Sequence, residues 1–272
     1  MIRRTSVCCL PVFLSLALLS CTETPAPQAP TDLTQVLTEI LAHWGSPGAS
    51  VSVVKDGQVV YQEGFGTTMA AGGFPVTPQT MAPVQSVSKG FTAVALSMLI
   101  QDGVLEWDAP VVTYIPEFEF GGPYLTEHIT VKDLMTHRGG TPFILGGWNP
   151  PDYTMNDLLA ELAESEPTIP LRSGVFYSQV GMALVGETLR RVSGKSWAEF
   201  VRDRILQPLG MGSSYSADPH LVEAMGPTDS IPNLLKTVGR SDTGLEDRAW
   251  AEYSELYWPA AALITTADDM AR

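Results

Sequence analysis

The sequence predicts an α+β protein with a large helical part, and three observations support this expectation. Two valine-rich runs flank an Asp-Gly pair within residues 49–66, a pattern typical of a β-hairpin. Apolar residues at helical spacing precede this hairpin, and several segments with helical spacing follow it. The order helix, hairpin, then many helices favours an α+β body with a large helical part.

The first residues of the chain are typical of an export signal. Arg3 and Arg4 precede an apolar run over residues 7–19, which is too short to span a bilayer as a permanent helix. We therefore expect residues 1–20 to be a signal peptide that is removed from the mature protein.

Cys21 follows Leu-Leu-Ser, a context that resembles the lipobox of bacterial lipoproteins. In such proteins the cysteine is lipidated after cleavage, and ordinary cleavage nearby is the alternative. The proline-rich segment that follows has no means of packing, so residues 21–31 are expected to form a tether. These features predict an exported protein of the cell envelope, held at the membrane by a lipid anchor and facing the periplasm or the cell exterior.

Charge and cysteine content exclude several classes of function. The formal net charge is −14, so the protein is not expected to bind nucleic acid. Cys8 and Cys9 lie in the predicted signal peptide and Cys21 at the predicted lipidation site, which leaves no thiol for a disulfide in the body of the protein. The histidines show no metal-binding spacing and no H-E-x-x-H motif. We therefore expect no metal, no cofactor and a monomeric protein.

The body of the protein begins with a helix and a hairpin. Residues 33–44 have apolar side chains at helical spacing, and Gly45 is expected to end that helix. The hairpin is expected to turn across residues 55–58, because Asp-Gly favours tight turns between strands.

The next long segment, residues 86–101, is apolar on every side. A helix without a polar face is a buried helix, and Gly103 provides its stop. Residues 138–154 are expected to form a long loop whose aromatic side chains, Trp148 and Tyr153, could cover a pocket. Shorter helices are expected at residues 130–137, 155–164, 179–193 and 196–207.

A lone lysine marks the candidate chemistry. Lys89 is the only residue with a formal charge between Glu63 and Asp102, and it follows Ser86 by three positions. Near the start of a helix, residues three apart share a face, so these two side chains can meet. A serine hydroxyl needs a base before it can act as a nucleophile, and a buried lysine with a lowered pKa can be that base. The structural alternative is a lysine that extends from a core helix to the surface.

The same S-x-x-K pattern also occurs at Ser52 and Lys55, within the first strand of the predicted hairpin. Side chains alternate between the faces of a strand, so residues three apart point to opposite sides. This second pair is therefore not expected to cooperate, and it shows that four residues alone are weak evidence.

Longer segments strengthen the assignment. The segments MAPVQSVSKGFTAVALSMLIQDGVLEWDAPVVTYIPEF, ITVKDLMTHRGG, FYSQVGMALVGETLRRVSGKSWAEFVRDRILQPLGMGSS and WPAAALITTADDMAR follow one another in the chain. Together they resemble the serine β-lactamase and penicillin-binding-protein superfamily, with class C β-lactamases, D,D-carboxypeptidases and related esterases as the nearest branch. The resemblance implies an antiparallel sheet flanked by helices, with a helical subdomain beside it.

The resemblance also implies roles for individual residues. Ser86 would be the acylated nucleophile and Lys89 its partner, and Tyr177 would transfer the proton as the first residue of a Y-x-N motif. The third position of that motif is Gln179 instead of asparagine, so substrate binding through this amide is expected to be weakened or redirected. His137 is expected to contribute to packing.

One motif of the superfamily is missing. Relatives have K-T-G or H-x-G on a strand near the C-terminus, and no such triplet follows Tyr177; Lys236-Thr237-Val238 lacks the glycine. We therefore expect residues 32–272 to be a hydrolase domain without its C-terminal strands, and we expect this chain to be poorly stable and nearly inactive.

The sequence thus predicts an exported serine hydrolase that acts through an acyl-enzyme. Its expected substrates are β-lactams, D-Ala-D-Ala peptides or small esters, so its partner is a small-molecule or peptide substrate. A non-catalytic lipoprotein that keeps the fold to bind peptidoglycan or another protein is the alternative. A third possibility is a chain that is inert because its gene was cut short.

Overall fold

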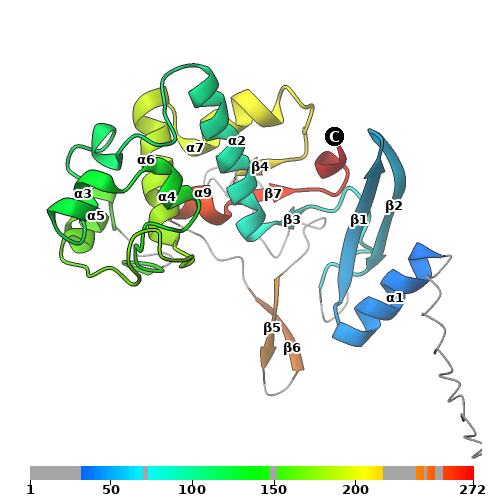
Figure 1. The fold of residues 1–272 in the computed structure, drawn as a ribbon. Coiled ribbons are helices and arrows are strands. Elements are labelled where there is room, and N and C mark those ends of the chain that lie inside the picture. The colour runs from blue at the N-terminus through cyan, green and yellow to red at the C-terminus, as the bar shows by residue number, and fades with distance from the viewer. Residues whose placement is uncertain (1–31, 70–72, 148–151, 217–236, 242–243, 249–253) are drawn as a thin grey trace, which may run out of the picture.

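The computed structural model describes residues 32–69, 73–147, 152–216, 237–241, 244–248 and 254–272. The predicted signal peptide, the tether with Cys21 and the aromatic residue Trp148 lie outside these described residues. The fold is α+β, with a helical part that lies beside small antiparallel sheets (Figure 1).

Helix α1 (Leu33–Trp44) and a two-stranded hairpin lie side by side (Figure 1). The Asp32 side chain caps the start of α1, and Gly45 ends it in the left-handed conformation with φ of 63°. Strands β1 (Gly48–Lys55) and β2 (Gln58–Gly66) pair antiparallel. Asp56 and Gly57 both have positive φ, as a tight hairpin turn requires, so the predicted helix and hairpin are confirmed.

The serine and lysine of the S-x-x-K pattern lie where a short 3₁₀ turn leads into helix α2. The turn covers Gln85–Val87, and α2 follows as Ser88–Gln101. The expectation that this helix is buried on every side is wrong, because Val94 is 47% exposed. One face of α2 packs against α6 (Gln179–Ser193), α7 (Trp197–Val201) and α9 (Trp258–Ala261), and the opposite face meets solvent. Gly103, with φ of 75°, follows the helix as predicted.

The helical part is built around α6, and capping residues define several of its helices. Each of the N-terminal residues Thr130, Thr154 and Ser196 exchanges hydrogen bonds with an acidic residue three positions later, which fixes the starts of α4, α5 and α7. The elements are the turn η2 (Val111–Thr113), α3 (Pro123–His128), α4 (Val131–Met135), α5 (Met155–Ala163), α6 (Gln179–Ser193), α7 (Trp197–Val201) and a π-type turn η3 (Arg202–Leu206).

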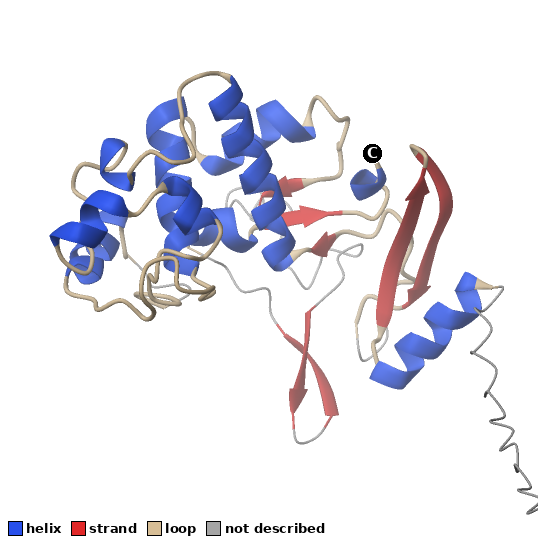
Figure 2. Cartoon of the chain, in the orientation of Figure 1, coloured by secondary structure: helices blue, strands red, loops and turns tan. Residues whose placement is uncertain are grey.

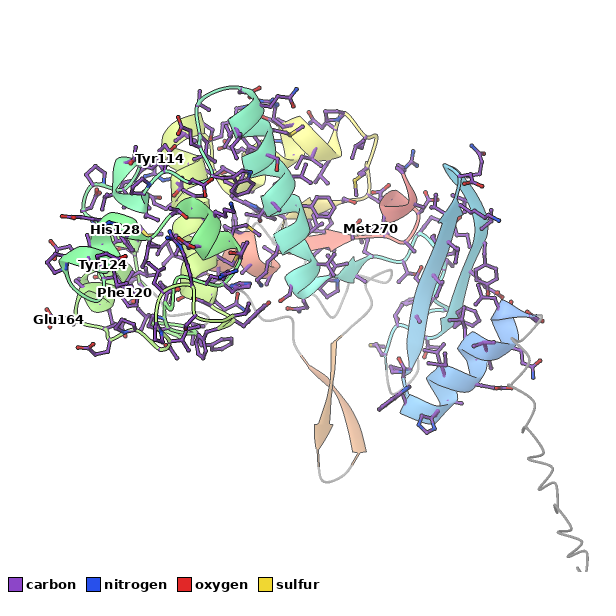
Figure 3. All side chains as sticks on the ribbon, viewed as in Figure 1. Tyr114, Phe120, Tyr124, His128, Glu164 and Met270 are labelled. Carbon is purple, nitrogen blue, oxygen red and sulfur yellow. The ribbon has the colours of Figure 1, made fainter. Side chains whose placement is uncertain are left out.

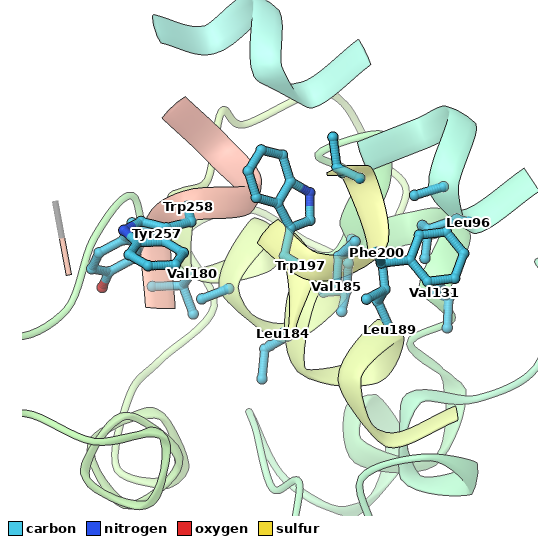
Figure 4. Packing of buried hydrophobic residues seen from close by; sticks show 14 of the residues in the cluster. Leu96, Val131, Val180, Leu184, Val185, Leu189, Trp197, Phe200, Tyr257 and Trp258 are labelled. Atoms are coloured by element: carbon cyan, nitrogen blue, oxygen red, sulfur yellow. The ribbon is translucent and has the colours of Figure 1, made fainter. Parts of the chain in front are cut away.

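The hydrophobic core surrounds α6, whose residues from Gln179 to Leu189 are all buried. Figure 4 shows Leu184 and Leu189 of α6 near the aromatic side chains Trp197 and Phe200. Gly186 allows a close approach, since a Cβ there would lie 2.3 Å from the Pro259 ring. Burial of this apolar surface supplies the main free energy that holds the helical part together.

A small sheet connects the helical part to the C-terminal residues (Figure 2). Its strands β3 (Ala82–Pro83), β7 (Leu263–Thr265) and β4 (Tyr215–Ser216) lie in the order β3-β7-β4, and both pairings are antiparallel. The remaining elements are β5 (Thr237–Ser241), β6 (Gly244–Arg248), the turn η5 (Glu255–Tyr257), α9 (Trp258–Ala261) and the turn η6 (Asp269–Ala271).

A cavity of about 490 Å³ lies between the hairpin and the C-terminal residues, lined by parts of β1, β3, β7 and η6. Met270, labelled in Figure 3, is one of its lining residues. Neither Ser86 nor Lys89 lines this cavity. Within the described ranges, no helix has both the length and the apolar character needed to cross a bilayer.

Candidate active site

The turn before α2 presents Ser86 to solvent. Gln85, directly before it, has a φ of 48°, a conformation that side chains other than glycine rarely adopt. Two hydrogen bonds hold the turn to β7. Val84 N–H donates to the Leu263 carbonyl at 3.0 Å, and Leu263 N–H donates to Ser88 Oγ at 3.0 Å. Ser88 Oγ in turn donates to the Gln85 carbonyl at 2.6 Å. The serine therefore stands exposed on a turn whose backbone is fixed.

Lys89 is buried and points toward this serine. The residue is only 8% exposed. Its Nζ donates to Ser86 Oγ at 3.1 Å and to the Ala260 carbonyl at 2.9 Å. Burial lowers the pKa of Lys89 below its ordinary value, and the hydrogen bond with Tyr177 offsets only part of that effect. The alternative of a lysine extending to the surface does not fit this geometry.

Tyr177 reaches the same serine from the segment before α6. Its hydroxyl donates to Ser86 Oγ at 2.7 Å, and the Lys89 amine lies 4.7 Å from the centre of its ring. Burial alone would raise the pKa of Tyr177, but hydrogen bonds with Lys89 and Ser86 and the charge of Lys89 outweigh it, so the pKa falls below its ordinary value. The structure thus brings together the three residues that the sequence predicts.

Gln179 is the first residue of α6 and lies beside this group. Its backbone N–H donates to the Phe143 carbonyl at 2.7 Å, and a side-chain hydrogen bond from Gln179 contributes to the lowered pKa of Tyr177. The residue is 3% exposed, and within the described part of the chain its Oε1 is a buried acceptor without a partner. Its contact with substrate stays a prediction.

Several interactions that support the site could not be predicted from the sequence. Ser178 caps α6 by accepting from Gly181 N–H at 2.9 Å. The backbone N–H of Ser178 donates to Nδ1 of His137 at 3.2 Å, so this histidine does more than fill space. Ala260 could not have been found from sequence, because only the fold places its carbonyl beside Lys89.

The other sequence features lie apart from this group. Ser52 Oγ accepts a hydrogen bond from Gln62 at 2.9 Å within the hairpin, and Lys55 is exposed at the hairpin end. Tyr153 packs against Gly146 and donates to Glu161 at 2.6 Å. In the part of the chain that the structure describes, no group of three or more His, Cys, Asp or Glu side chains could hold a metal ion.

Comparison with known sequences connects this geometry to a family. The family described as Beta-lactamase matches residues 33–272. The chain belongs to the β-lactamase family. The family's fold is the one observed, because a class C β-lactamase structure superimposes with a TM-score of 0.71 at 25% identity, covering 87% of this chain and 60% of that chain.

Two relatives show the range of hydrolases within this family. Unguisins hydrolase ungD′ of Aspergillus campestris is 29% identical over 211 residues, which cover 73% of this chain and 38% of the relative. Esterase EstB of Burkholderia gladioli is 28% identical over 182 residues, which cover 60% of this chain and 45% of the relative. The chain therefore spans less than half the length of these β-lactamase-family relatives.

Proposed function

We propose that this protein is a serine hydrolase that works through an acyl-enzyme on Ser86. The observation that supports the proposal is the position of Ser86 Oγ, which lies 3.1 Å from the amine of Lys89 and 2.7 Å from the hydroxyl of Tyr177. The pKa values of both neighbouring groups lie below their ordinary values, so each is deprotonated, and able to accept the serine proton, at a lower pH than usual.

Acylation follows from this arrangement. Ser86 Oγ attacks the carbonyl carbon of the substrate, and its proton passes along the short contact to deprotonated Tyr177 or Lys89. The same proton is then delivered to the leaving nitrogen or oxygen as its bond to the carbonyl carbon breaks. In the second half, water attacks the acyl carbon, its proton returns through the same groups, and Ser86 and a carboxylic acid are released.

The proposed substrates are β-lactams, D-Ala-D-Ala peptides or small esters. All three present an acyl carbon to a serine, and they differ in the leaving atom. The relatives include a hydrolase of unguisins and an esterase, which supports acyl transfer as the common chemistry. Gln179 in place of asparagine is the residue through which we expect amide substrates to be disfavoured.

Covalent labelling tests the proposal. A fluorophosphonate probe should form a bond from Ser86 Oγ to phosphorus with loss of fluoride, and mass spectrometry should locate the adduct on the peptide that contains Ser86. Ser86→Ala should abolish labelling. Ser52→Ala is the matched control, because Ser52 belongs to the same S-x-x-K pattern but bonds to Gln62 in the hairpin, and it should label normally.

The absence of any adduct on folded protein would overturn the hydrolase proposal in favour of a non-catalytic protein that retains the fold. Labelled penicillin, a D-Ala-D-Ala peptide and an activated ester, tested in parallel, would then separate the three substrate classes in a protein that does label.

We further propose that the protein is exported and lipid-anchored through Cys21. The support comes from the sequence before Cys21 and from the proline-rich segment after it. Expression in a bacterium with a labelled fatty acid should place label on the protein, and Cys21→Ser should remove the label and release the protein from the membrane fraction. Recovery of unlabelled wild-type protein in the soluble fraction would contradict this.

A further inference from the structure

His137 stands in an uncommon backbone conformation at the end of α4. Its φ is 59°, in the left-handed region that residues other than glycine seldom adopt. Hydrogen bonds on both sides hold it there: its N–H donates to the Leu134 carbonyl at 3.1 Å, and its own carbonyl accepts from Phe176 N–H at 2.9 Å. The segment that leads into Tyr177 is therefore fastened to this turn.

The imidazole of His137 contacts the same segment a second time. Its ring lies against the ring of Tyr177, with centres 4.6 Å apart. Its Nδ1 accepts a hydrogen bond from the backbone N–H of Ser178 at 3.2 Å. Because a backbone N–H can only donate, Nδ1 must be unprotonated, and the proton of the neutral ring must be on Nε2.

The surroundings of this ring favour its neutral form. Burial lowers the pKa of His137, and the charge of Lys89 on α2 lowers it further. Tyr177 is the ionisable group that faces the ring from the segment before α6. On α4 itself, the carboxylate of Asp133 is bound by Arg172 and Thr130, so it is not free to pair with a protonated imidazole.

We propose that His137 is a positioning residue, which in its Nε2–H form holds the phenol of Tyr177 on Ser86 through the ring contact and the bond to Ser178. This inference rests on the proposed function for its kinetic consequence only. Protonation of Nδ1 would remove the acceptor and place a second cation near Lys89. The segment that carries Tyr177 would then loosen, and proton transfer to and from Ser86 would slow.

Two variants separate the parts of this role. His137→Asn retains an acceptor near the place of Nδ1, and asparagine tolerates a positive φ, but the ring contact is lost. His137→Phe retains a ring but offers no acceptor to Ser178. If the bond to Ser178 fixes the phenol, kcat for an activated ester should fall by roughly 10²-fold in His137→Phe, the scale expected for a misplaced catalytic group, with KM little changed. His137→Asn should restore most of that loss.

His128 provides the matched control. It also contacts a tyrosine ring, with its centre 4.2 Å from that of Tyr124. Both residues, labelled in Figure 3, belong to α3, which contributes none of the three residues around Ser86 Oγ. His128→Phe should leave kcat and the pH profile unchanged. Equal loss in both phenylalanine variants, or no loss in His137→Phe, would overturn the proposal.

A measurement that needs no turnover distinguishes this inference from the proposed function. NMR of ¹⁵N-labelled histidine in Ser86→Ala protein should show the Nε2–H form of His137 at neutral pH. With tyrosine labelled at ¹³Cζ, the pKa of Tyr177 should rise in His137→Phe, because the phenol moves away from Lys89, and should stay low in His137→Asn. An Nδ1–H ring, or a Tyr177 pKa indifferent to both variants, would refute the positioning role even in an active enzyme. If NMR supports the positioning role but the wild-type protein forms no fluorophosphonate adduct, only the hydrolase proposal is overturned.

Discussion

At the scale of single residues, the amine of Lys89 has exchanged water for two protein oxygens, the hydroxyl of Ser86 and the carbonyl of Ala260. Neither oxygen carries a formal charge, so neither compensates for an ammonium ion as a carboxylate would. The pKa of the amine is therefore lowered, so the neutral form that can act as a base for the hydroxyl is reached at a lower pH than in water. The neighbouring phenol of Tyr177 donates to the same hydroxyl, and Lys89 and Tyr177 each affect the pKa of the other.

This coupling predicts a pH dependence for acylation. The pKa values of Lys89 and Tyr177 both lie below their ordinary values of 10.5 and 10.0. The deprotonated fraction grows as pH rises through the pKa, so a lowered pKa moves the half-maximal labelling rate to lower pH. The rate of fluorophosphonate labelling of Ser86, measured against pH, should rise with an apparent pKa below 10 and then level off.

Lys89→Arg tests the assignment, because a guanidinium keeps a cation but cannot lose its proton in this range. Its labelling should be slow at every pH. An unchanged profile in this variant, or a wild-type midpoint at or above 10, would contradict the role of the amine.

At the scale of elements, the turn before α2 depends on its bonds to β7. Ser88 is fully buried, and its hydroxyl satisfies both the Gln85 carbonyl and the Leu263 N–H. Ser88→Ala removes the side-chain acceptor of the buried Leu263 N–H, and we expect a loss of about 1–3 kcal/mol in the free energy of unfolding. Labelling at Ser86 should also slow, because the turn that presents it loses its attachment.

Ser97→Ala on the same helix is the control for that prediction. Its hydroxyl is exposed and donates only to the Ala93 carbonyl one turn earlier. Urea unfolding of the two variants should therefore differ clearly in midpoint. Equal stabilities would show that the attachment of the turn to β7 contributes little.

Elements also show how far sequence reasoning reaches. Local signals predict α1 and the hairpin, because Gly45, Asp56 and Gly57 act on the backbone next to them. The helical spacing of apolar residues predicts α6. The S-x-x-K spacing placed Ser86 beside Lys89, since both lie within one turn. Sequence could not predict that Val94 is exposed, because the partners of α2 come from distant segments.

The same limit applied to the site. Tyr177 was found through resemblance, and its hydroxyl was placed on Ser86 only by the fold. The sequence predicts only a packing role for His137, and nothing in LMTHRGG indicates that its Nδ1 accepts from the Ser178 N–H forty-one positions later. Ala260 contributes a carbonyl, which every residue has, and so it left no signal at all.

At the scale of the whole molecule, a partly buried ion pair connects α4 to the segment before α6. Arg172 donates two hydrogen bonds to the carboxylate of Asp133, at 2.9 and 2.7 Å. Burial would raise the pKa of Asp133, but the bonds from Arg172 and Thr130 outweigh it and lower the pKa below its ordinary value. The pair therefore stabilises the fold above the pKa of the unfolded carboxyl, and this contribution is lost as pH falls through the lower, folded-state pKa.

Arg172→Met should lower the free energy of unfolding at neutral pH by roughly 1–3 kcal/mol, toward the smaller value because the arginine is half exposed to water. The difference from wild type should shrink in strong acid. Lys132 lies on the same helix as Asp133, and its ion pair with Asp108 is exposed. Lys132→Met should therefore change the free energy of unfolding little. Thermal unfolding across a pH series measures both, and a loss in Arg172→Met that does not vary with pH would contradict the electrostatic origin.

The bond between Lys89 and the carbonyl of Ala260 joins parts of the chain that are 171 positions apart. While the polypeptide is still being synthesised, Lys89 emerges long before its partner, and in that interval water keeps its amine protonated. The nucleophile is then no more reactive than any other serine. Ser86 would become reactive only late in biosynthesis, when α9 packs against α2. A ribosome-bound intermediate would therefore not react with acyl substrates.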